Sequence, residues 1–266
     1  MKEIIFYLLM FCIGTLFGSF FTLAVYRIPL HQDITHKRSY CPNCNHKLSF
    51  FDMIPILSYI FLGGRCRYCK NKIRPRYLIL EILTGIVFLL FAMSVNISFN
   101  LNSILYLSIG ILYLAGIIII AGIDKEQRKI ENAILLYEVL IAALYMVYLY
   151  VVAKTNIYKY AIYLVCLVIL LIINNVYFKK KLKNSYPIDI LELSVIMIIF
   201  STEITYVSTV IITLLSIIIG AIENFIIKAT NKASKTNKSY YKDLPIGFYL
   251  VCANIISIIL INFIKM

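Results

Sequence analysis

Charged residues are scarce in this chain, and acidic residues are the scarcest of them. Only 15% of the 266 residues are charged, and only 13 are Asp or Glu. A soluble domain carries about 25% charged residues, whereas here 61% of the residues are hydrophobic. Because apolar runs of about 20 residues recur along the whole length, a single soluble core is excluded and a polytopic membrane protein is predicted.

The sequence also lacks the pattern of a cleavable signal at its first apolar run, residues 4–25. This run is longer than the apolar core of a secretory signal peptide. It ends in Tyr26-Arg27-Ile28-Pro29 instead of a small-residue cleavage site. We therefore expect the run to be retained as a transmembrane helix.

Apolar runs of this kind predict an all-α protein with about eight transmembrane helices. The expected spans are residues 4–26, 78–95, 101–123, 132–152, 160–178, 188–204, 206–227 and 244–264. We expect three parts of the chain: a first transmembrane helix (1–30), a loop domain (31–77) and a C-terminal transmembrane domain (78–266).

Positive charges gather on one side of these expected spans. With the N-terminus placed outside, 22 of the 26 Lys and Arg residues fall on inside segments. Such an excess is typical of cytoplasmic loops. We therefore expect a multi-pass cell-membrane protein whose 31–77 loop is cytoplasmic. The net charge of +13 then reflects topology and some contact with anionic lipid, and no nucleic-acid partner is predicted.

Four cysteines in that basic loop form two CxxC pairs with 21 residues between them: Cys41, Cys44, Cys66 and Cys69. Four thiolates at this spacing can hold one tetrahedral Zn²⁺. A reducing cytoplasm disfavours disulfides and favours metal thiolates. Because four sulfurs leave no open position on the metal, we predict a structural zinc-ribbon-like loop without a catalytic role.

Two aspartates stand at the cytoplasmic ends of expected spans. Asp124 ends the third span, and Asp189 begins the sixth. Two carboxylates that share a site can hold one proton between them and activate a water for attack on a peptide carbonyl. The alternative is that both are ordinary interfacial carboxylates, near Lys125 and Lys183.

Other acidic residues lie in or near apolar segments: Glu81, Glu138, Glu192 and Glu223. Ionisable groups inside a membrane are candidates for function. For Glu138 and Glu223 we favour a structural role. Glu138 can face polar neighbours, and Glu223 can reach water near the inside end of its span.

Several segments of the chain match the motifs of a known family. Residues 18–29 follow the pattern GSFxNVxxYRxP, with Thr22 in place of Asn. Residues 41–69 follow CPxC…DxIPxxSY…GRCRxC, residues 76–85 follow RYxxxExxTG, and residues 245–249 are similar to PFGPxL. On these motifs the chain resembles the type IV prepilin peptidases, membrane aspartic proteases of the A24 type.

The resemblance implies that Asp124 and Asp189 are the catalytic pair. Asp124 matches the family's DxxxxxIPN segment, with Glu131 in place of Pro. Asp189 stands where the family has GxGD followed by Lys, but Tyr186 and Ile188 replace the glycines and the Lys is missing. Because glycine permits positive φ and close backbone approach, we expect the backbone before Asp189 to differ from that of the family.

The resemblance also implies a reaction. The family removes the short basic leader of type IV prepilin or pseudopilin precursors at the cytoplasmic membrane face. Many members then methylate the new N-terminus with S-adenosylmethionine. No glycine-rich nucleotide loop is present here, so methylation, with Asp52 or Glu81 as contributors, is implied by the resemblance alone.

Two other functions stay open on the sequence. The lost glycines favour a catalytically impaired relative that binds pilin precursors as an assembly factor. A transporter with Asp124 and Asp189 as an ion relay is less favoured, because transporter sites usually lie at the bilayer midplane.

Overall fold

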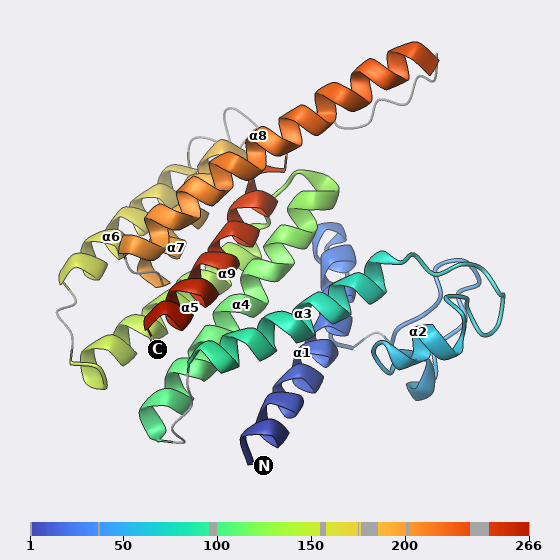
Figure 1. Ribbon diagram of the computed structural model, residues 1–266, viewed down its shortest axis with the longest axis horizontal. Helices are drawn as coiled ribbons and strands as arrows, with labels where there is room; N and C mark the ends of the chain where they lie inside the picture. The colour runs from blue at the N-terminus through green and yellow to red at the C-terminus, as the bar shows by residue number, and fades with distance from the viewer. Residues whose placement is uncertain are drawn as a thin grey trace. The chain divides into compact units, whose positions relative to one another are not determined.

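Helices account for most of the described residues in the computed structural model (Figure 1). The structure describes residues 2–36, 38–95, 100–154, 158–174, 176, 186–200, 203–234 and 245–265. The long helices are α1 (Lys2–Arg27), α3 (Arg76–Ser94), α4 (Leu101–Gln127), α5 (Asn132–Val151), α6 (Tyr158–Ile173), α7 (Tyr186–Phe200), α8 (Glu203–Ser234) and α9 (Ile246–Lys265). Short helices are η1 (Ile28–Leu30), η2 (Phe50–Met53) and α2 (Leu57–Phe61).

The described part of each expected span lies mainly on one of the long helices, but the count of eight spans is not confirmed. Within the described residues, five helical segments are long and apolar enough to cross a membrane: Glu3–Leu30, Arg76–Ser94, Leu101–Gln127, Asn132–Val151 and Ile246–Ile264. Helices α6 and α7 have 16 and 15 residues, fewer than the about 20 that a crossing needs. The predicted all-α polytopic membrane fold is nevertheless confirmed.

The first of two compact units runs to Ile119 and is built on the pairing of α1 with α3. The two helices approach closely at glycines. A methyl group on Gly14 would lie 2.8 Å from the Cα of Gly85, and one on Gly18 would lie 2.7 Å from the Cα of Glu81. Small residues permit such contact between membrane helices, which explains the glycine that opens the 18–29 motif.

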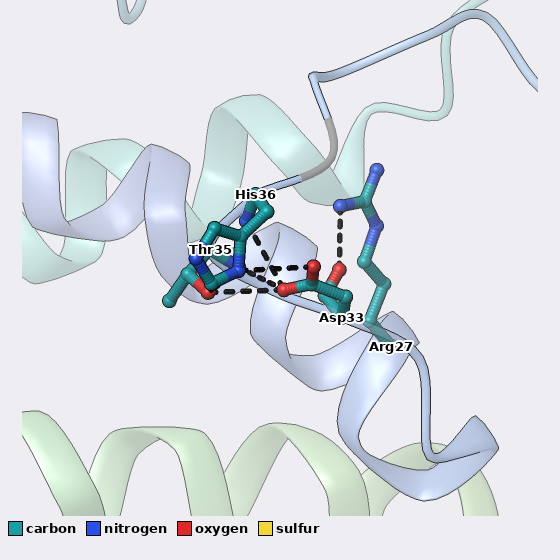
Figure 2. A network of polar contacts seen from close by, with 4 residues as sticks. All are labelled: Arg27, Asp33, Thr35 and His36. Carbon is teal, nitrogen blue, oxygen red and sulfur yellow. Dashed lines mark hydrogen bonds and ion pairs between the residues drawn. The ribbon is translucent and has the colours of Figure 1, made fainter.

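Hydrogen bonds attach the start of the segment between α1 and α3 to the last residue of α1. The Arg27 side chain is buried and donates hydrogen bonds to the backbone carbonyls of Asp33, at 2.9 Å, and Arg38, at 3.2 Å. Figure 2 shows Arg27 beside the turn in which the Asp33 carboxylate accepts hydrogen bonds from Thr35 and His36. The loop therefore begins as an ordered structure.

The second unit, Ile120–Lys265, contains the end of α4 and helices α5 to α9. Helix α7 contacts α5, α6, α8 and α9. Polar side chains are buried inside this unit: Asp124, Glu138, Asn174, Asp189, Glu192 and Asn254. Burying ionisable groups in a membrane protein is costly, so such groups are candidates for function.

Candidate functional site

The two CxxC pairs fold into two copies of the same small turn. In the first, the N–H of Cys41 bonds to the carbonyl of His46, and that of Asn45 bonds back to Cys41. In the second, Cys66 and Lys70 repeat this pattern. Asn45 and Lys70 both adopt positive φ, at 56° and 58°, directly after the second cysteine of each pair. The two cysteine pairs are therefore presented by two turns with the same backbone geometry.

The four sulfurs lie within 4.8 Å of one another, and those of Cys41 and Cys69 are 3.9 Å apart. A tetrahedral Zn²⁺ with Zn–S bonds of about 2.3 Å places its sulfurs about 3.8 Å apart. The N–H of Asn71 and the side-chain amide of Asn43 lower the pKa of Cys69 to about 6, whereas burial and the neighbouring cysteines raise the pKa of Cys44 to about 11, so the fit to a metal rests on the donor set and its geometry. The donor set and its spacing therefore fit zinc.

Asp52 ties η2 to the second cysteine turn. Its carboxylate accepts hydrogen bonds from the backbone and hydroxyl of Ser49, at 3.1 and 2.8 Å. It also pairs with Arg67 at 2.6 Å and accepts a hydrogen bond from Tyr68. Burial opposes ionisation of Asp52, but these hydrogen bonds and the arginine outweigh it and lower the pKa of the carboxyl. Asp52 thus has an evident structural role.

Glu81 joins the loop to α3. Its carboxylate accepts the backbone N–H of Ile56 at 2.8 Å and a hydrogen bond from the side chain of Ser19 in α1. Ile56 has φ 63° and ψ −55°, a strained conformation for a β-branched residue. The carboxylate therefore holds a tight turn of the loop against the α1–α3 pair.

Asp124 is fully buried near the end of α4, at the first turn of α9. Its Oδ2 accepts the N–H of Phe248 at 2.8 Å, and the N–H of Gly247 also bonds to the carboxylate. The first N–H groups of a helix have no partner within the helix, and they attract negative charge. A methyl group on Gly247 would lie 3.1 Å from Oδ2, so the missing side chain gives the carboxylate room.

Tyr186 connects Asp124 to the start of α7. Its hydroxyl hydrogen-bonds the Asp124 carboxylate and accepts the N–H of Ile246 at 3.1 Å. Tyr186 is the first residue of α7 and Asp189 lies three positions later. Residues three apart share a helix face, so the turn that bonds to Asp124 also carries Asp189.

Asp189 is buried and shares a donor with a second acid. The side-chain amide of Asn174 donates to Asp189 Oδ1 at 2.6 Å and to Glu192 Oε1 at 2.8 Å. All three side chains are at most 1% exposed. Asp124 and Asp189 are both buried. Lys125 lies over the ring of Phe248 at 4.5 Å.

Three further charged residues from the sequence analysis are Glu138, Lys183 and Glu223. Glu138 is fully buried in α5, and its carboxylate oxygens have no hydrogen-bond partner among the described residues. Lys183 and the side chain of Glu223 lie outside the described residues.

Sequence reasoning missed Asn174 and the contact made by Tyr186. For Asn174 the signal was a polar side chain that ends an apolar run.

Comparison with known proteins bears on the first part of the chain. Residues 12–95 match the family described as Bacterial Peptidase A24 N-terminal domain. The predicted resemblance to the prepilin peptidases is confirmed. No solved structure matches the chain.

Several relatives carry the name Prepilin leader peptidase/N-methyltransferase. The protein from Myxococcus xanthus is 42% identical over 84 residues, 32% of this chain and 25% of the relative. That from Klebsiella pneumoniae is 31% identical over 133 residues, 48% of this chain and 56% of the relative. That from Bacillus subtilis is 34% identical over 129 residues, 48% of this chain and 50% of the relative.

The similarity is therefore partial. The chain spans between a quarter and about half of the length of these relatives. Within the family match lie α3, most of α1 and the four-cysteine loop, whereas Asp124 and Asp189 lie beyond it. The family match therefore assigns no role to the two aspartates.

Proposed function

We propose that this chain is a membrane aspartic endopeptidase that removes the leader from type IV prepilin-like precursors. The observation that carries the proposal is the hydrogen bond from the first residue of α7 to the buried Asp124, with the buried Asp189 three residues later on the same helix. Tyr186 bonds to Asp124, and the same turn of α7 carries Asp189. The names of the relatives supply the substrate class.

The aspartates divide the chemistry between them. Two carboxylates that share one proton provide an acid and a base at the same time. The protonated carboxyl polarises the scissile carbonyl, and the ionised one takes the proton from an attacking water. Asp124 Oδ2 is bonded to Phe248, whereas Oδ1 has no hydrogen-bond partner among the described residues. We assign Oδ1 as the atom that faces the reacting groups.

The proposed site lies at the cytoplasmic face of the cell membrane, with the N-terminus of the chain outside. The concentration of Lys and Arg on one side of the spans supports this orientation. A precursor whose basic leader meets an apolar helix presents its scissile bond at that face. An active site at the end of α4 would meet this bond without unwinding the substrate helix.

We propose a structural zinc held by Cys41, Cys44, Cys66 and Cys69. Four thiolates complete the coordination of the metal, so zinc would cross-link the loop without entering the reaction. We also propose methylation of the new N-terminus with S-adenosylmethionine, on the names of the relatives. Asp52 accepts hydrogen bonds within the loop, and Glu81 of α3 accepts the N–H of Ile56; their contribution to methylation rests on the resemblance alone.

An assembly factor that binds precursors without cutting them is the alternative. Its motivation is the replacement of the two family glycines by Tyr186 and Ile188. Co-expression with a prepilin, followed by mass spectrometry of the prepilin N-terminus, separates the two functions. A shortened precursor supports the peptidase. A full-length precursor that co-purifies with the chain supports the assembly factor.

A further inference from the structure

Two short helices of the loop expose large apolar side chains. Phe50 and Phe51 in η2 are 73% and 69% exposed, and Leu57, Ile60 and Phe61 in α2 are 51%, 62% and 83% exposed. Helices η2 and α2 contact each other, so we call these five residues the apolar loop face. Apolar clusters of this kind on a loop mark an interaction site.

The apolar loop face is tied to α3 near the start of the candidate membrane span of that helix. Ile56 directly precedes α2, and its N–H is bonded to Glu81 of α3. Glu81 lies five residues after Arg76, the start of the apolar span. At about 1.5 Å per residue, this anchor sits about 7.5 Å along the helix from that start. That depth is typical of the headgroup and acyl boundary rather than of bulk water.

Both ends of the loop meet at the same end of the helix pair. The contacts Gly14 with Gly85 and Gly18 with Glu81 show that α1 and α3 run antiparallel. Arg27, the last residue of α1, holds the first loop residues by hydrogen bonds to two carbonyls. A segment tethered at both ends to membrane-spanning helices meets the bilayer at high effective concentration.

The charge of the loop complements an anionic surface. Its two acidic residues, Asp33 and Asp52, are engaged within the loop, by Thr35 and His36 and by Ser49 and Arg67. Six further basic residues of the loop are exposed: Arg38, Lys47, Arg65, Lys70, Lys72 and Arg74. A segment that combines exposed basic side chains with exposed large apolar ones is typical of those that lie in the interface of anionic membranes.

We propose that the apolar loop face inserts into the interfacial region of the bilayer that the chain spans, and that the exposed basic residues bind anionic lipid headgroups. The loop then lies on the membrane instead of projecting into water. This binding does not depend on peptidase activity. It would fix the position of the loop relative to the membrane surface, where a membrane-embedded substrate must approach.

The absence of tryptophan from the chain makes the test direct. We would make Phe61→Trp and reconstitute the full chain in nanodiscs of phosphatidylcholine and phosphatidylglycerol, with or without bromine on the acyl chains of the phosphatidylcholine. Leu8→Trp, at an exposed position of α1, reports full contact with lipid. We expect bromine to quench Phe61→Trp by at least half as much as Leu8→Trp. Weaker quenching overturns the proposal.

Two further variants guard against a misfolded loop and test the charges. Phe51→Trp must show the same quenching as Phe61→Trp. In the Phe61→Trp background, Arg74→Glu must reduce the quenching in anionic nanodiscs. If either tryptophan instead shifts its emission to the blue without bromine quenching, on addition of a prepilin peptide or at higher protein density, then a protein covers this face and the membrane assignment is wrong.

Discussion

Tyr186 shows how one residue alters a turn that the family builds with glycine. The sequence suggested that Tyr186 and Ile188 could not follow a glycine backbone, and neither is among the described residues with positive φ. The backbone is instead helical from Tyr186 onward, and Pro187 is tolerated because the first helical turn needs no N–H donor there. The Tyr186 phenol bonds to Asp124, the aspartate at the end of α4, and not to Asp189 three residues on.

We predict that Tyr186→Phe lowers the rate of prepilin cleavage about tenfold to a hundredfold. The change removes a donor to a carboxylate and the acceptor of the Ile246 N–H, and a hydrogen bond to a charged group contributes about 1.5–3 kcal/mol. Cleavage kinetics with a synthetic precursor should show the loss in kcat more than in KM. Tyr150→Phe, at an exposed site on α5, serves as the control, and equal rates for both variants would contradict the role of Tyr186.

Asn174 is the second residue whose contribution emerges only from the fold. It lies at the end of α6, yet its amide meets Asp189 and Glu192 of α7. A sequence shows that an asparagine interrupts an apolar run. It does not show which helix that asparagine faces, because helix packing decides this.

Substituting Asn174→Ala should destabilise the chain by about 1–3 kcal/mol, because two buried carboxylates lose a shared donor. The measurement is the thermal unfolding midpoint in detergent micelles, with Ile172→Ala on the exposed face of α6 as the control. A midpoint as high as that of the control would show that the amide does not hold the two acids.

At the scale of elements, the sequence predicts the cysteine turns but does not predict the hydrogen bond that attaches the loop to α3. The CxxC spacing and the zinc-ribbon-like loop follow from four residues and the tetrahedral preference of zinc. The hydrogen bond from Ile56 to Glu81, by contrast, joins residues 25 positions apart. Such contacts are decided by how the loop packs on α1 and α3.

We predict one zinc ion per chain, lost from Cys69→Ser and retained by Cys166→Ser, whose cysteine is exposed on α6. Chelation should open the loop to trypsin at its basic residues, while the helices stay intact. Elemental analysis and limited proteolysis measure both effects. Zinc retained by Cys69→Ser at the level of the unchanged chain would argue against the four-thiolate site.

Acid should loosen the loop through Asp52. Its pKa is lowered in the folded state, so its contribution is complete above the ordinary value of about 3.9. That contribution is lost as the pH falls through the lower folded-state pKa. In zinc-free protein, pepsin cleavage of the loop should therefore rise more steeply on acidification for the unchanged chain than for Asp52→Asn. Parallel pH profiles would show that Asp52 does not stabilise the loop.

At the scale of the whole molecule, sequence and structure agree on helices and differ on spans. The expected helix boundaries fall within a few residues of the observed ones for α3, α4 and α5, because apolar runs of membrane helices are long and end in polar turns. Helices α6 and α7 are too short to be assigned as spans by length.

The family match and the two aspartates lie in different parts of the chain. The family match at residues 12–95 covers α3, most of α1 and the cysteine loop, where motifs are dense. The aspartates lie in the second unit, where the family motif is altered at Tyr186 and Ile188. Chemistry in that unit is therefore inferred from burial, hydrogen bonds and shared helix faces.

The central claim is that Asp124 and Asp189 act together in peptide cleavage. The most direct measurement is mass spectrometry of a prepilin co-expressed with the unchanged chain, Asp124→Asn, Asp189→Asn or the neighbouring Glu126→Gln, with membrane levels of each variant measured in parallel. We predict a shortened prepilin with the unchanged chain and with Glu126→Gln, and a full-length one with either aspartate variant at normal levels. Full cleavage by either aspartate variant would contradict the account.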